Sequence, residues 1–413
     1  MKLKLTILFL FASLTMISQE GSLFELTPEL MIGISAEANE NFPDRSLQKQ
    51  ILLNFGWDHT YNPNEWSHRL KGPKTGVSIS YTDYGNKDSL GSSFTLLPFI
   101  EFKAFKSERI KVLAGMGGSY FTKKYDSISN PNNQAITTDL VWSFRLFMYY
   151  QFLQSKRFDC RIVMGYFHHS NGHTRLPNQG LNSFLVSLSA DIKKEEEPRV
   201  TPIRDFQRSR YPYLSFRTGY GANVLSNHTF NDKKNIYTIT GEYGWVFNNT
   251  FKLGAGFYYR FYEHYYDYIK DDEFLVRDGE EFEEFKDNPW FNASNIGFFV
   301  SGEVIMNHIG IDAQIGLNLH KPMYKVDWRI NEGWDYIPKE IPPNAYLGEF
   351  NTKFRMKHLI STRMGMKYYL IGMDKKPKNN VFVGFHINAN LGQADFTELS
   401  IGYVYNFKNK SND

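Results

Sequence analysis

The chain has a single cysteine, almost no net charge and, past its first twenty residues, no long apolar run. One Cys in 413 residues leaves no internal disulfide to hold the fold. No later stretch approaches the ~18 apolar residues of a spanning helix, which excludes a helical membrane protein. Lys and Arg (47) nearly balance Asp and Glu (44), so we expect no nucleic-acid partner. Aromatic residues are abundant at 16% although the mean hydropathy is only −0.44, and this composition excludes a disordered chain.

Residues 1–18 have the features of a secretory signal peptide. Lys2 and Lys4 precede an apolar run from Leu5 to Leu14, and the small residue Ser18 follows. We therefore expect an exported protein whose mature chain begins at residue 19.

The remaining chain alternates between apolar and polar residues with a period of two. In 309–320, one face carries apolar residues and the other carries polar residues or glycine: Ile309, Ile311, Ala313, Ile315, Leu317 and Leu319 against Gly310, Asp312, Gln314, Gly316, Asn318 and His320. Such segments of about ten residues are typical of transmembrane strands. We predict an all-β, antiparallel transmembrane β-barrel of about 16 strands (range 12–16), from residue 29 to the last strand near 394. A soluble β-sandwich would also alternate and is the alternative.

The predicted barrel has two parts, 19–195 and 211–413, separated by a charged stretch at 193–210. We favour one barrel that uses both parts, because only the last strand ends near the C-terminus on an aromatic residue, Phe407. Two smaller barrels of about eight strands are the alternative. The tight turn 154–156 and the long connection 171–180 predict that the latter is extracellular.

Three polar residues lie on the apolar, lipid-facing side of two neighbouring predicted strands, His168, Ser170 and Asn182. A serine hydroxyl needs a base within hydrogen-bond reach, and the histidine base needs a third group that orients it. Asn171 and the backbone N–H of Gly172 are candidate donors to an oxyanion. The alternative is a polar rim without chemistry.

The motif residues resemble a known family. His168-His169-Ser170-Asn171-Gly172 followed by Pro177-Asn178-Gln179-Gly180-Leu181-Asn182 is similar to the signature of lipid A 3-O-deacylases of the PagL type. The resemblance implies a lipid-facing barrel esterase, with His168 as base, Ser170 as nucleophile and Asn171 as oxyanion donor. It assigns the supporting loop to Pro177, Asn178 and Gly180. The closing segment 386–405 is similar to longer relatives called acyloxyacyl hydrolases, found in bacteria of the Bacteroidetes type.

One position departs from the family pattern, because Asn182 stands where the deacylases have glutamate. A Ser-His-Asn triad is similar instead to outer-membrane phospholipase A, which uses calcium. We expect a lipid A deacylase without cofactor or metal, in the bacterial outer membrane, with its active site at the outer leaflet. The alternatives are a calcium-dependent phospholipase, or a non-catalytic channel or surface barrel. The expected partner is lipid A or a phospholipid, and a homodimer is left open.

Overall fold

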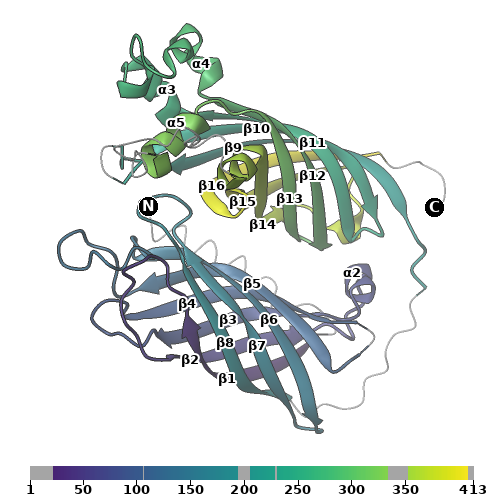
Figure 1. Ribbon diagram of the computed structural model, residues 1–413. Helices are drawn as coiled ribbons and strands as arrows, with labels where there is room; N and C mark the ends of the chain where they lie inside the picture. Colours follow the sequence, from purple (N-terminus) through teal and green to yellow (C-terminus); the bar gives the residue numbers. More distant parts are fainter. Residues whose placement is uncertain (1–21, 106, 194–204, 228–229, 334–351, 408–413) are drawn as a thin grey trace. The chain divides into compact units, whose positions relative to one another are not determined.

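The computed structural model describes residues 22–105, 107–193, 205–227, 230–333 and 352–407. The chain divides into two compact units, one of Met1–Asn171 and Pro177–Phe206, the other of Gly172–Leu176 and Gln207–Asp413. Each unit contains one closed antiparallel barrel of eight strands (Figure 1). The predicted signal peptide, 1–18, lies outside the described residues.

The first barrel contains strands β1 to β8 and one short helix, α2. Their bounds are β1 (Leu23–Ser35), β2 (Gln48–Asp58), α2 (Glu65–Arg69), β3 (Lys74–Asp83), β4 (Ser92–Lys103), β5 (Ile110–Phe121), β6 (Leu140–Gln154), β7 (Phe158–Ser170) and β8 (Leu181–Lys193). Each strand pairs with its neighbour along the chain, and β8 pairs back with β1, as in Leu30 opposite Leu188.

The second barrel contains strands β9 to β16, and several short helices lie in its connections. The strands are β9 (Arg210–Asn223), β10 (Lys234–Phe247), β11 (Phe251–Tyr262), β12 (Ser294–Met306), β13 (Ile309–His320), β14 (Ile360–Tyr369), β15 (Asn379–Asn390) and β16 (Gln393–Asn406). The helices are α3 (Glu263–Lys270), η1 (Phe274–Val276), η2 (Glu283–Asp287), α4 (Pro289–Asn292), α5 (Tyr324–Trp328), η3 (Arg329–Gly333), α6 (Thr352–Leu359) and η5 (Met373–Lys375). The barrel closes where β16 pairs with β9.

The expectation of one barrel is therefore wrong, and the alternative of two eight-stranded barrels is correct. Eight strands enclose an interior that side chains can just fill, so each half can close on itself. The terminal aromatic residue marks the end of one barrel but does not determine which strands pair.

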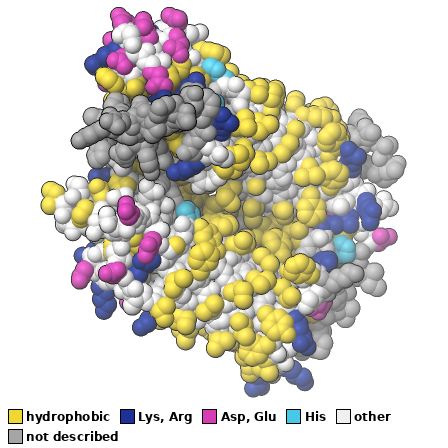
Figure 2. Space-filling view, in the orientation of Figure 1, with side chains coloured by type: hydrophobic (Ala, Val, Ile, Leu, Met, Phe, Trp, Pro, Cys, Tyr) yellow, Lys and Arg dark blue, Asp and Glu magenta, His cyan; other side chains and the backbone are white. Residues whose placement is uncertain are grey.

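The outward faces of both barrels are apolar, as the alternation predicted. Exposed residues on β1, for example, are Leu30, Ile32 and Ile34, whereas the intervening residues are covered or lie partly inside. Figure 2 shows hydrophobic side chains spread over the strands, with charged side chains at the ends. This surface suits lipid, and the polar interior explains the low mean hydropathy of a chain so rich in aromatic rings. None of the helices in the described part of the chain combines the length and apolar character needed to cross a membrane.

Paired charges fill the interior of the first barrel. The Arg161 guanidinium lies 3.0 Å from Glu101 and 2.9 Å from Asp191, and Lys74 Nζ lies 2.8 Å from the same aspartate. A buried charge is tolerated only when it is paired and hydrogen-bonded. These pairs allow a polar core in a barrel whose outside is apolar.

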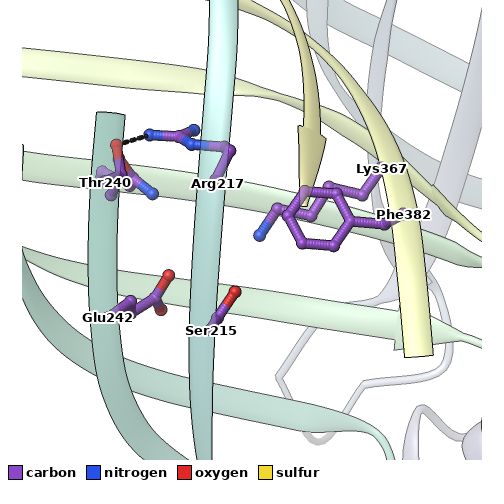
Figure 3. Close-up of a pocket in the computed structure, with 7 residues that line it drawn as sticks. Ser215, Arg217, Thr240, Glu242, Lys367 and Phe382 are labelled. Carbon is purple, nitrogen blue, oxygen red and sulfur yellow. Dashed lines mark hydrogen bonds between the residues drawn. The ribbon is translucent and has the colours of Figure 1, made fainter. Parts of the chain in front are cut away.

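The second barrel has a comparable interior. Arg363 bridges Asp312 and Glu398 at 3.1 Å each, and Lys367 Nζ lies 2.8 Å from Glu303. A cavity of about 10 Å³ nearby has room for a single water molecule (Figure 3). Its lining residues are Ser215, Arg217, Thr240, Glu242, Gln314, Lys367 and Phe382. Mostly polar and charged side chains therefore surround this cavity.

Candidate active site at the ends of β7 and β8

The candidate site is formed where β7 ends and β8 begins. In the antiparallel register, His168 lies opposite Asn182, and Tyr166 lies opposite Phe184. Met164 on β7 and Phe184 on β8 are more than half exposed on the outer surface. The alternation therefore places His168 and Asn182 on the outward side, as the sequence predicted.

The structure brings His168 and Asn182 into direct contact. His168 Nδ1 lies 2.7 Å from Asn182 Oδ1, and both side chains are half-buried. Because an amide oxygen only accepts hydrogen bonds, this contact places the imidazole proton on Nδ1. The other nitrogen, Nε2, then carries the lone pair that a general base requires.

Ser170 ends β7 two residues after His168, and Asn178 of the following loop binds it. Asn178 Nδ2 donates to Ser170 Oγ at 2.9 Å, while Asn178 Oδ1 accepts from the backbone N–H of Asn171 at 3.1 Å. Only 4% of Ser170 is exposed, because the loop covers it. Asn178 thus fixes the nucleophile candidate relative to the next residue of the chain.

The two expected oxyanion donors, Asn171 and Gly172, differ in their hydrogen bonds and in their backbone conformation. The backbone N–H of Asn171 is donated to Asn178, so an oxyanion contact from Asn171 would come from its side-chain amide. Gly172 is buried, has a φ of 66° and belongs to the second compact unit. Its role as an oxyanion donor stays a prediction.

The rest of the supporting loop contacts the connection between β5 and β6, and its last residue, Gly180, lies against His168. Thr137 Oγ1 donates to the carbonyl oxygen of Pro177, and Gln179 N–H donates to that of Gln134 at 3.1 Å. Gly180 has a φ of 73°, and a Cβ there would lie 2.8 Å from His168 Cε1. The loop needs glycine at this position for both reasons.

Tyr166 is a part of the site that the sequence did not single out. Its hydroxyl donates to Asn182 Oδ1 at 2.5 Å, so this oxygen has two partners. The Tyr166 ring lies nearly parallel to the His168 ring, with the centroids 6.4 Å apart, and it also contacts Phe184. The only sequence signal was its position two residues before His168 on the same face.

His169 points the opposite way, into the barrel. It is fully buried, with Nδ1 2.8 Å from Ser143 Oγ and Nε2 3.1 Å from the Tyr84 hydroxyl. His169 therefore lies on the opposite face of β7 from His168.

The described residues at the ends of β7 and β8 form no cluster of metal-ligating side chains. Among the described residues, no three or more His, Cys, Asp or Glu side chains gather as a metal site would require. The expectation of an enzyme without cofactor or metal stays a prediction.

Comparison with known proteins gives one family. Residues 51–191, which include His168, Ser170 and Asn182, match the family described as lipid A 3-O-deacylase (PagL). No curated protein sequence matches the chain.

Several solved barrel structures are similar at low identity. The outer membrane enzyme PagL is 18% identical, with 41% of this chain and 99% of that chain covered and a TM-score of 0.29. A BenF-like porin from Pseudomonas fluorescens Pf-5 is 9% identical, with 94% and 99% covered and a TM-score of 0.20. The outer membrane protein opdK from Pseudomonas aeruginosa is 10% identical, with 94% and 100% covered and a TM-score of 0.20.

The family match covers the strands that hold the motif, and it agrees with the resemblance seen in the sequence. The chain is therefore similar to the lipid A 3-O-deacylase (PagL) family over residues 51–191.

Proposed function

We propose that the first barrel is a serine esterase of the bacterial outer membrane that removes an acyl chain from lipid A. The observation that carries the proposal is the contact between His168 and Asn182 on the outward face, beside Ser170, within the region matched by the deacylase family. Polar side chains on a lipid-facing surface are costly and therefore point to a function.

The proposed reaction is acyl transfer through a covalent intermediate. Ser170 Oγ attacks the ester carbonyl carbon and gives its proton to His168 Nε2. The bond to the sugar oxygen breaks as that oxygen takes the proton from His168, which leaves the acyl group on Ser170. A water molecule then attacks the acyl-enzyme, His168 again takes and returns a proton, and the fatty acid leaves.

The surroundings of the site suit a lipid ester. Met164, Phe184 and Val186 form an exposed apolar surface next to the His168–Asn182 pair. An acyl chain in the outer leaflet would lie along this surface, while the sugar would lie at the strand ends near the loop 171–180. The ester bond would then lie between them, at the level of Ser170.

A calcium-dependent phospholipase A is the second candidate, and Asn182 is the observation that favours it. The Ser-His-Asn combination has a neutral third member, unlike the glutamate of the deacylases. The two candidates differ in substrate and in calcium requirement, so one assay series separates them.

The test is mass spectrometry of lipid A from cells that lack the gene and from cells that express wild-type, Ser170→Ala or Ser187→Ala protein. Ser187 is a matched control, because it lies on the same barrel and its hydroxyl bonds to the backbone of its neighbour Leu188. We expect lipid A from cells with wild-type or Ser187→Ala protein to lack one acyl chain. Lipid A from cells without the gene, or with Ser170→Ala protein, should keep that chain.

Identical lipid A in all four strains would overturn the deacylase proposal. Release of fatty acid from glycerophospholipids that requires both calcium and Ser170 would establish the phospholipase instead. Conductance across planar bilayers that is unaffected by Ser170→Ala, without ester cleavage, would favour the channel alternative.

A further inference from the structure

Asn182 poses a problem that a glutamate would not. A carboxylate presents an acceptor oxygen whichever way it turns, but an amide has an oxygen on one side and an NH2 group on the other. If the NH2 group faced His168, it would donate to Nδ1 and force the ring proton onto Nε2. The base would then have no lone pair to offer Ser170, and a wrong tautomer costs orders of magnitude in rate.

Tyr166 is placed to resolve this ambiguity. Its hydroxyl lies 2.5 Å from the same Asn182 oxygen that contacts His168 Nδ1. A phenol donates a hydrogen bond more readily than it accepts one, so it favours the oxygen of the amide over the NH2 group. The cross-strand register fixes the arrangement, because Tyr166 lies one outward position before His168, opposite Phe184.

The environment strengthens this contact. Tyr166 and Asn182 are both half-buried, and the Tyr166 ring packs against Phe184 at 5.5 Å between centroids. On this outward surface the hydroxyl meets little competition from water, and unpaired polar groups next to lipid are costly. The amide therefore has a defined orientation.

We propose that Tyr166 is a positioning residue that holds the Asn182 oxygen toward His168, so that a neutral amide orients the base. The inference rests on the proposed esterase function. Tyr166 acts through Asn182 and His168 and does not itself contact the reacting ester.

The test is a double-mutant cycle of Tyr166→Phe and Asn182→Glu, with kcat and KM measured on lipid A in mixed micelles. Tyr166→Phe keeps the ring and removes the hydroxyl. In the protein that keeps Asn182 we expect kcat to fall about fivefold to tenfold with KM unchanged, the loss of one hydrogen bond. In the Asn182→Glu protein, where both oxygens accept, we expect Tyr166→Phe to change kcat less than about twofold.

Tyr81→Phe is the matched control. Tyr81 is another outward tyrosine of the first barrel, and its hydroxyl lies 2.9 Å from Ser92 Oγ. We expect this variant to behave as wild type. An equal loss of kcat from Tyr166→Phe with and without the Asn182→Glu substitution would indicate packing and overturn the proposal, as would no loss in either protein.

A readout that does not need activity separates this inference from the proposed function. In protein with 15N-labelled histidine, we expect the His168 signals of a ring protonated on Nδ1, and a shift toward the other tautomer in Tyr166→Phe. Unchanged tautomer populations would overturn the positioning role. An inactive protein that shows the expected shift would overturn the esterase and keep the positioning role.

Discussion

At the scale of single residues, the end of β7 is held from both sides of the barrel wall. His168 faces outward and contacts Asn182, while His169 faces inward and contacts Ser143 and Tyr84. Neither ring can turn without losing a hydrogen bond. The backbone that carries the candidate base is therefore well fixed, and small changes next to it have measurable effects.

Gly180→Ala is expected to reduce esterase activity about 100-fold while the barrel still folds. A methyl group at this position would lie 2.8 Å from His168 Cε1, so the ring would have to move from its place. A displacement of about 1 Å is enough for a loss of this size. The measurement is kcat on lipid A, with thermal unfolding in detergent as the check on folding.

Gly279→Ala controls for the backbone effect alone. Gly279 has a similar φ of 83°, but a Cβ there meets no atom within 4 Å. Both variants strain the backbone by about 1–2 kcal/mol, and only Gly180→Ala disturbs the histidine. Equal activities in the two variants would contradict the contact with His168.

The sequence could predict part of this site, for a physical reason. Alternation with a period of two placed His168 and Asn182 on one face, and their chemistry indicated a base and its partner. The contacts of Tyr166 and Asn178 depend on strand register and loop geometry, which alternation leaves undetermined.

At the scale of elements, the strands could be predicted with good accuracy because each has one apolar face. The predicted segment 309–320 agrees with β13, and the last strand, expected near 394, begins at Gln393. The largest error is β1, predicted near residue 29 but beginning at Leu23. Pro28 looks like a strand terminator in the sequence, yet it lies on the outward face within β1.

The connection between β2 and β3 contains a buried histidine that should make the first barrel sensitive to acid. His59 Nδ1 accepts from Asn62 at 3.2 Å and Nε2 lies 2.7 Å from Thr75 Oγ1, so the ring is neutral. Burial lowers the pKa of His59 to about 4, against a smaller opposing effect of Asp58.

Protons then bind the unfolded chain before the folded one, so stability falls as the pH drops from about 6.5 to 4. We expect a loss on the order of 3 kcal/mol over this range, measured by urea unfolding in detergent. His59→Gln should flatten this dependence, whereas His68→Gln, at an exposed position of α2, should leave it unchanged. Identical acid sensitivity in wild type and His59→Gln would contradict the prediction.

At the scale of the whole molecule, the number of barrels could not be predicted from the sequence. Alternation shows that strands exist, but closure depends on pairing between distant strands, such as β1 with β8. The charged stretch at 193–210 was the only local sign of a boundary. A long connection within one barrel would have the same composition, so the pattern allowed both architectures.

A chain ended at Phe206 is expected to fold by itself, because β1 to β8 close without any strand from the second half. Folding would be measured by the heat-dependent shift in gel mobility of barrels and by resistance to trypsin. A chain ended at Gln154 is the control, since it lacks β7 and β8 and leaves two unpaired strand edges. Failure of the chain ended at Phe206, with normal folding of the full chain, would contradict independent closure.

The outward position of His168 and Asn182 also determines how molecules reach them. A site that opens to the lipid surface is supplied by lateral diffusion in two dimensions, not from the aqueous phase. The quantity that sets its occupancy is the mole fraction of a lipid in the leaflet. Adding inert detergent lowers the mole fraction of that lipid while its concentration in the sample stays constant, and should therefore slow turnover. Diluting the whole suspension leaves the mole fraction unchanged and should not slow turnover.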